Sequence, residues 1–113
     1  VENTLKLLRS PNRPDAILAF NDIITFAAYT AIRQMKLNIP EDVALIGFTD
    51  DIHTEYVTPR MSVIADQSQT MGAEACRLLL KAIGGDNKIR QVIVPQKLVI
   101  RETSAKKHMT TLK

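Results

Sequence analysis

The stretch "PDAILAFNDIITFAAYTAIRQMKLNIPEDVALIGF", residues 14–48, decides the fold of this chain. Residues 16–20 are apolar throughout, and so are most of residues 43–48. Short continuous apolar runs of this kind are typical of strands that are covered on both faces. The intervening residues 23–37 carry apolar side chains at helical spacing. Strand, helix and strand in succession predict a βαβ unit with parallel strands and a right-handed crossover.

The helical stripe of residues 23–37 predicts which side faces the sheet. Its apolar members are Ile24, Ala27, Ala28, Ala31, Ile32 and Met35. Thr25, Tyr29, Arg33 and Lys36 fall largely away from this stripe. Asn38 and Pro40 are expected to end the helix.

The remaining segments extend the same α/β pattern. Residues 1–9 resemble the end of a helix whose start is missing, and 10–14 form a proline-containing loop. A polar loop at 49–59 precedes a strand at 61–65 and a helix at 69–83, which Gly84-Gly85 ends. Residues 91–100 are extended, and Pro95 requires an edge or a bend there. The fold class is therefore α/β, a three-layer Rossmann-like parallel sheet.

Polar residues follow each of the three predicted strands. They are Asn21-Asp22, Thr49-Asp50-Asp51 and Asp66-Gln67. In sheets of this class, ligands bind beyond the carboxyl ends of the strands. The sequence thus predicts one shared binding edge.

Composition limits the classes of function. The net charge of +3 comes from Lys106, Lys107 and Lys113, and without them acidic and basic residues balance at 12 each. We expect residues 105–113 to be a basic, disordered tail, with direct nucleic-acid contact the weaker alternative. No apolar run reaches the roughly 18–20 residues of a membrane span, and no signal peptide is visible, so we expect a cytoplasmic protein without membrane contact.

Cysteine and histidine give no indication of a cofactor or a metal. The single Cys76 excludes an internal disulfide and is expected to be a packed, structural thiol. His53 and His108 lie far apart in sequence, without a metal-ligand spacing.

Four segments resemble the C-terminal part of a LacI/GalR-family transcriptional regulator. They are "PDAILAFND" (14–22), "AIRQMKLNIPEDVALIGFTDD" (31–51), "TPRMSVIADQSQTMGAEACRLLL" (58–80) and "VPQKLVIRETS" (94–104). They occur in the family's order and cover most of residues 14–104. Such a family member senses a small effector, a sugar or a nucleobase, between two lobes of periplasmic-binding-protein-like fold.

The resemblance also implies what surrounds this sequence. Residues 1–104 would be part of the C-terminal lobe, with helix 67–84 belonging to the other lobe. Operator DNA would be bound by an N-terminal helix-turn-helix that this sequence does not contain. We expect a homodimer, in which helix 67–84 is a candidate for exchange between copies.

The resemblance assigns effector binding to the first polar cluster. Asp22 matches a family position that binds effector hydroxyls or ring nitrogens, which a carboxylate accepts well. The alternative is a helix cap, because Asn and Asp are both favoured there. Both roles are compatible if Asn21 caps the helix and Asp22 reaches the ligand.

The third polar cluster departs from the family. Asp66 stands where the family commonly has Gln, so either Asp66 or Gln67 would supply the contact. A plain turn at the strand end is the alternative.

The second cluster is assigned to dimerisation rather than chemistry. Phe48, Asp50 and Tyr56 belong to a region that lies near the dimer contact in the family, with core or surface positions as alternatives. Paired carboxylates lack a supporting His, Lys or nucleophile motif, so no catalytic residue is expected.

Three classes of function remain open at this point. The first is the effector-sensing and dimerisation module of a LacI-type regulator, acting by population shift. The second is a periplasmic sugar-binding protein of a transport system, which shares the fold. The third is an enzyme on the same scaffold, which the lack of a catalytic cluster disfavours.

Overall fold

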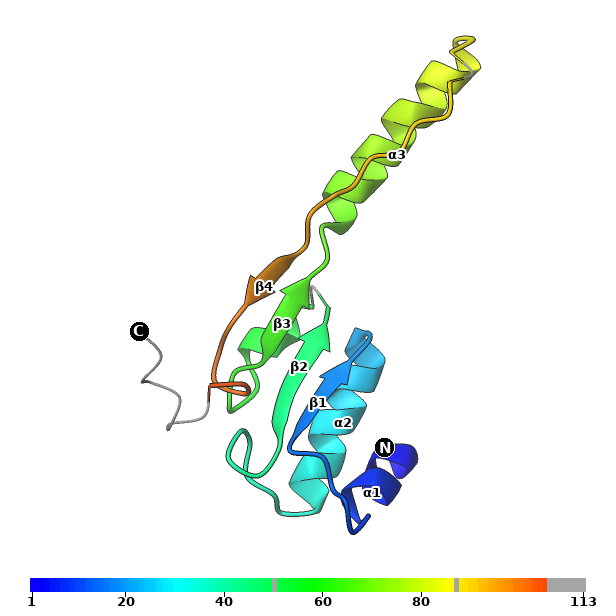
Figure 1. Cartoon of the computed structure of the whole chain (residues 1–113). Helices are drawn as coiled ribbons and strands as arrows, with labels where there is room; N and C mark the ends of the chain where they lie inside the picture. The colour runs from blue at the N-terminus through cyan, green and yellow to red at the C-terminus, as the bar shows by residue number, and fades with distance from the viewer. Residues whose placement is uncertain (50, 87, 106–113) are drawn as a thin grey trace, which may run out of the picture.

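The computed structural model describes residues 1–49, 51–86 and 88–105 (Figure 1). In chain order the elements are α1 (Glu2–Leu8), β1 (Ala16–Ala19), α2 (Asp22–Gln34), β2 (Ala44–Phe48), the 3-10 helix η1 (Ile52–Glu55), β3 (Ser62–Ala65), α3 (Ser68–Ile83) and β4 (Lys97–Val99). Each predicted helix and strand is present, with ends shifted by a few residues.

The strands form one sheet in the order β1-β2-β3-β4. β1, β2 and β3 run parallel, and β4 returns antiparallel to β3. The predicted α/β class is therefore confirmed as a mostly parallel sheet with α2 as a crossover. Of the extended segment 91–100, only the part after Pro95 pairs in the sheet.

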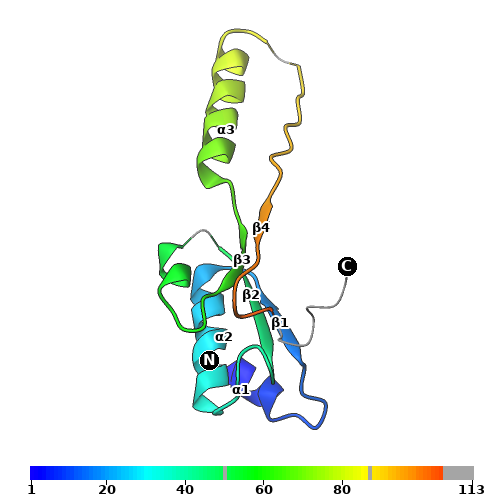
Figure 2. The same ribbon diagram turned by 90° about the vertical axis from the view of Figure 1, so that its left-hand side faces the viewer.

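α2 covers one face of the sheet, where the core lies (Figure 2). Ala28, Ala31 and Ile32 of α2 are buried, as predicted. The predicted stripe is wrong at two positions. Ile24, predicted to face the sheet, is exposed, whereas Thr25, predicted to lie away from it, is fully buried. Thr25 packs against Gly47 of β2. Any side chain at position 47 would clash with Thr25, because a Cβ there would lie 2.5 Å from Thr25 Cγ2.

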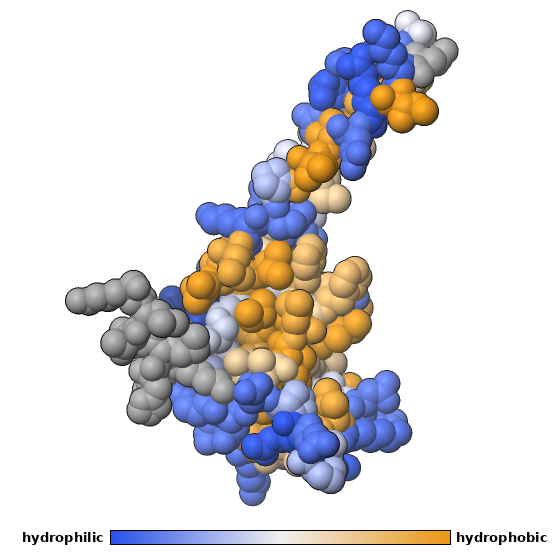
Figure 3. Space-filling view, in the orientation of Figure 1, coloured by the Kyte–Doolittle hydropathy of each residue, from blue (hydrophilic) through white to orange (hydrophobic). Residues whose placement is uncertain are grey.

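The opposite face of the sheet has no helix over it among the described residues. The register places Leu18 beside Ile46, and Phe48 beside Ile64, which in turn lies beside Leu98. Figure 3 shows apolar side chains gathered over the sheet. We call this surface the open face.

α3 projects beyond the carboxyl ends of the strands, beside the segment that returns to β4 (Figures 1 and 2). Consequently the molecule is elongated, with extents of 58 × 38 × 27 Å. No residue of α3 is buried, and the prediction of a packed Cys76 is wrong, because this helix leaves the sheet and exposes the thiol. Within the described residues, no helix has both the length and the apolar character needed to cross a membrane.

Residues that follow β4 close the amino ends of β2 and β3. Thr103 is fully buried, and its hydroxyl accepts from Ser62 N (2.8 Å) and donates to the Leu45 carbonyl (2.7 Å). Its backbone N–H donates to Arg60 O, and its carbonyl accepts from Leu45 N. This end of the sheet is thus held by hydrogen bonds and leaves the carboxyl end to form a site.

Candidate functional site

A hollow of about 460 Å³ lies at the carboxyl ends of β1, β2 and β3. It is lined by Phe20, Asn21, Asp22, Phe48, Thr49, Asp51, Asp66 and Ser68. We call it the strand-end hollow. Residues from all three polar clusters predicted from the sequence line this hollow.

Asn21 and Asp22 make different hydrogen bonds at the start of α2. Asn21 is the N-cap, and its side-chain oxygen accepts from Ile24 N at 2.8 Å. Asp22 is exposed at the first helical position, and one carboxylate oxygen accepts from Ile23 N at 2.8 Å. A carboxylate has room for further donors on its remaining lone pairs, so Asp22 can both stabilise the helix start and meet a ligand.

Asp51 is held in place by its own loop. Its carboxylate accepts from the His53 backbone N–H at 2.7 Å and lies 2.6 Å from His53 Nδ1. The backbone hydrogen bond, followed by the bond to the ring, lowers the pKa of Asp51 below its ordinary value. Thr49 supports this turn by accepting from Asp51 N at 3.0 Å. The segment predicted as a polar loop, 49–59, contains the 3-10 helix η1.

Asp66 and Gln67 separate at the start of α3. Asp66 lines the strand-end hollow and accepts from Ser68 Oγ at 2.7 Å. Gln67 instead lines a neighbouring hollow of about 290 Å³, together with Asp66 and the first turn of α3. The structure thus brings Asp66, rather than Gln67, beside Asn21 and Asp22.

Two aromatic rings form one wall of the strand-end hollow. Phe20 and Phe48 stack with centroids 6.0 Å apart and planes inclined by 21°. Sequence reasoning treated Phe20 only as the end of a strand and missed it as a site residue. Its position was readable from parity, because 16, 18 and 20 share a strand face and 20 comes next to the polar pair.

Of the three residues expected at a dimer contact, the structure describes Phe48 and Tyr56. Tyr56 is exposed just after η1. Phe48 lines the strand-end hollow, and Asp50 lies outside the described residues.

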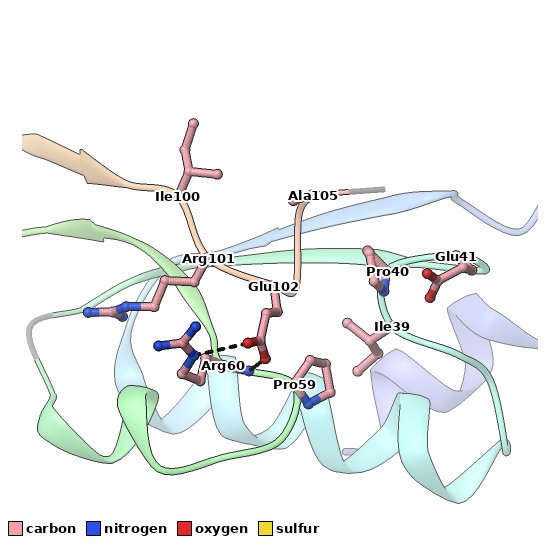
Figure 4. Close-up of a pocket in the computed structure, with 9 residues that line it drawn as sticks. All are labelled: Ile39, Pro40, Glu41, Pro59, Arg60, Ile100, Arg101, Glu102 and Ala105. Carbon is pink, nitrogen blue, oxygen red and sulfur yellow. Dashed lines mark hydrogen bonds and ion pairs between the residues drawn. The ribbon is translucent and has the colours of Figure 1, made fainter. Parts of the chain in front are cut away.

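A second hollow, of about 480 Å³, lies at the amino ends of the strands (Figure 4). Three of its four charged residues, Arg60, Arg101 and Glu102, make structural contacts. Arg60 donates its backbone N–H and its Nε to the Glu102 carboxylate at 2.8 and 3.0 Å. Arg101 donates to the Met61 carbonyl and to Glu55. These contacts secure the turn before β3 and the chain after β4.

The strand-end hollow has the chemistry of a site that binds hydroxyl groups. Carboxylate oxygens accept hydrogen bonds in fixed directions, and the aromatic wall offers apolar contact. Among residues 1–49, 51–86 and 88–105, no group of three His, Cys, Asp or Glu is arranged to hold a metal ion.

Comparison with known proteins places these features in a family. Residues 1–104 match the model of the periplasmic binding protein-like domain. The HTH-type transcriptional regulator DegA of Bacillus subtilis (strain 168) is 35% identical over 95 residues, which are 83% of this chain and 28% of DegA. The lactose operon repressor of Rhizobium radiobacter is 35% identical over 101 residues, which are 89% of this chain and 88% of that sequence.

Solved structures agree with this placement. The LacI family transcriptional regulator from Arthrobacter sp. FB24 in complex with lactose superposes with a TM-score of 0.79 at 28% identity. The match covers 92% of this chain and 40% of that one. Apart from the Rhizobium sequence, this chain therefore spans well under half the length of these relatives.

Proposed function

Because the chain belongs to the LacI family of transcriptional regulators, within its periplasmic binding protein-like domain, we propose that it senses a small effector for a DNA-binding regulator. The observation that carries this proposal is the strand-end hollow, which lies at the carboxyl ends of three neighbouring strands. A relative of the same fold has been solved in complex with lactose, which supports a sugar as the effector class. Such a regulator acts where its operator is, in the cytoplasm.

The residues proposed to bind the effector are Asn21, Asp22, Asp66 and Gln67. Asp22 and Asp66 would accept hydrogen bonds from effector hydroxyls, since both line the hollow. The oxygen of Asn21 is used by the helix cap, so its contribution is the amide NH₂ group. Gln67, one residue beyond Asp66, would reach only a ligand that extends toward α3.

The proposed mechanism uses the position of α3. This helix and the returning segment extend past the hollow, joined to the sheet through residues 66–67 and 91–96. We assign α3 to the opposite lobe of the sensor. An effector that binds one arrangement of the lobes more tightly shifts the population toward it, and this shift is coupled to DNA affinity.

A homodimer completes the proposal. Tyr56 is exposed at the end of η1, and Tyr29 of α2 donates to the Thr58 carbonyl at 2.6 Å, which ties this loop to the core. This hydrogen bond holds the end of the loop against α2, and Tyr56 lies exposed two residues earlier. We propose Phe48, Asp50 and Tyr56 as its dimer residues, with Phe48 also facing the hollow.

A transport receptor and an enzyme are the alternatives. The relatives described above are transcriptional regulators, which favours the first reading over both. The decisive experiment measures DNA binding by the natively expressed protein against the region upstream of its gene. It is titrated at fixed salt, with and without sugars and nucleobases. Tight binding that one compound changes supports the regulator, whereas a ligand without any DNA binding supports the transport receptor.

Replacing Asp22 tests the site directly. Asp22→Ala is expected to weaken effector binding by about 1–3 kcal/mol, because a hydrogen bond from an effector hydroxyl to the carboxylate is lost. Calorimetric titration measures the affinity. Glu41→Ala is the matched control, since it removes an exposed carboxylate from the hollow at the other end of the sheet and should leave the affinity unchanged. Unchanged affinity in Asp22→Ala removes this residue from the site.

A further inference from the structure

The 3-10 helix η1 packs incompletely against the sheet. A hollow of about 300 Å³ lies between them, and its lining includes Thr54 and Glu55 of η1, Val63 of β3 and Val99 of β4. Side chains that line such a gap lack apolar neighbours on one side, so apolar packing holds η1 less firmly than it holds α2. The position of η1 therefore depends on polar contacts to the sheet.

Arg101 supplies these contacts from the far side of the same hollow. Its side chain is only 17% exposed. The guanidinium donates to the Met61 carbonyl at 2.8 Å, to Thr54 Oγ1 at 3.3 Å and to the Glu55 carboxylate at 2.7 Å. Because a guanidinium presents its donors in a rigid planar fork, it holds these acceptors in one arrangement. One side chain thus joins η1 to the start of β3.

The backbone of Arg101 is anchored in the sheet. Its N–H donates to Ser62 Oγ at 2.8 Å, and its carbonyl accepts from that hydroxyl at 3.0 Å. Ser62 is itself fully buried in β3. A side chain that starts from a fixed backbone loses less freedom when it makes its contacts, so the guanidinium is well placed to fix η1.

η1 carries exposed apolar side chains at both ends. Ile52 lies at its start and Tyr56 directly after its end, and both are more than half exposed. Tyrosine is enriched at protein interfaces, and a contact surface that is rigid before binding loses less entropy on association. Whether Ile52 and Tyr56 act as one surface therefore depends on how firmly η1 is held.

From these contacts we propose that Arg101 is a positioning residue for the homodimer contact. It binds Thr54 and Glu55 and so fixes η1, with the result that Ile52 and Tyr56 meet the second copy of the chain together. Arg101 acts from behind η1 and does not itself touch the partner. This inference rests on the proposed homodimer and names the residue that prepares its contact surface.

The test measures the dimer dissociation constant of the natively expressed protein by analytical ultracentrifugation. Arg101→Met keeps a long side chain but removes all donors, and it is expected to raise this constant about tenfold or more. Arg101→Lys keeps the charge without the planar fork and should have an intermediate effect. Glu102→Gln is the matched control, because it weakens the neighbouring ion pair with Arg60, which does not involve η1. It should leave the dimer dissociation constant unchanged.

A double-mutant cycle separates positioning from a general loss of stability. If Arg101 acts through the surface of η1, then Arg101→Met should have a smaller effect on dimerisation when Tyr56 has already been replaced by alanine. A general loss of stability would instead affect both backgrounds equally. Thermal unfolding of each variant identifies a temperature at which all of them are folded, and the cycle is measured there.

Three results would overturn the inference. They are an unchanged dimer dissociation constant in Arg101→Met, an equal increase in Glu102→Gln, and additive effects of the Arg101 and Tyr56 changes. If Arg101→Met does not fold, the milder Arg101→Lys takes its place in the same cycle and decides. An unchanged protein that is monomeric at tens of micromolar would remove the homodimer and this inference together. DNA binding that a small molecule changes would still support the regulator in that case.

Discussion

At the scale of single residues, the buried side chain of Thr103 links two strands of the sheet. One hydroxyl satisfies both Ser62 N and the Leu45 carbonyl, which come from neighbouring strands. Buried polar groups that lose a partner are costly because water cannot replace it. The end of the sheet away from the strand-end hollow is therefore held by a residue from the last part of the described chain.

Thr103→Val tests this contact, because valine keeps the shape and removes the hydroxyl. We expect the free energy of unfolding to fall by about 1–3 kcal/mol, measured by urea denaturation. Thr103→Ser retains the hydroxyl and removes one methyl group, so it should cost about 0.8 kcal/mol. An equal loss in both variants would show that packing, rather than hydrogen bonding, matters here.

The Glu102 carboxylate predicts a dependence of stability on pH. The Arg60 backbone N–H and then its guanidinium lower the pKa of Glu102 from its ordinary value of 4.5. A carboxyl group with a lowered folded-state pKa contributes stability above the unfolded-state pKa and loses it as pH falls through the folded-state value. The stabilisation should therefore be complete at neutral pH and decline below about pH 4.5.

The variant Glu102→Gln should be less stable than the original protein at pH about 7, with the difference vanishing in acid. Thermal unfolding across this pH range measures both proteins. Arg60→Gln and the double variant complete a cycle, and a coupling that persists in strong acid would refute the assignment to this ion pair.

At the scale of elements, the contact between α2 and β2 is set by one close approach. Gly47 leaves space for the buried Thr25, whose hydroxyl donates to the Asn21 carbonyl at 2.5 Å. Gly47→Ala would drive a methyl group into Thr25 and is expected to cost about 1–3 kcal/mol by overpacking. Chemical denaturation provides the value.

Combining Gly47→Ala with Thr25→Ala should recover part of that loss, because the second change removes the atoms that clash. Gly72→Ala on α3 is the matched control, since a Cβ there meets nothing within 4 Å. It is expected to leave stability unchanged or slightly improved, as alanine favours helix. Simple additivity of the Gly47 and Thr25 changes would contradict the proposed clash.

The same elements explain what sequence could and could not predict. The strands and α2 follow from local periodicity, so residues 14–48 sufficed for the βαβ unit. The exchange of Ile24 for Thr25 in the core did not, because it depends on a glycine of another strand. The prediction of a packed Cys76 was wrong for a similar reason, because an apolar stripe on a helix is buried only when another element packs against it. In the site, the polar strand ends and the strand face of Phe20 were predictable, whereas the stacking of Phe20 on Phe48 depends on the register between β1 and β2.

At the scale of the whole molecule, two apolar surfaces shape its behaviour. The open face includes Leu18 and Leu98, both more than half exposed, and α3 exposes Leu79 and Ile83. Surfaces of this kind favour association.

The 113-residue chain is accordingly expected to form a homodimer at tens of micromolar, measured by light scattering. Leu79→Glu with Ile83→Glu should weaken association if helix exchange or helix packing joins the copies. Lys81→Glu on the same helix is the control for added negative charge. A monomer for the unchanged chain would count against the dimer proposal.

The closure by Thr103 also has a consequence for the order in which the molecule acquires its structure. Thr103 pairs with Leu45 across 58 positions and with Ser62 across 41. Contacts at such separation form late, since the loop between them must close first, and during synthesis they cannot form until residue 103 has left the ribosome. A nascent chain that stops before this residue should show rapid amide exchange at the amino ends of β2 and β3, and slow exchange should begin only once Thr103 has emerged.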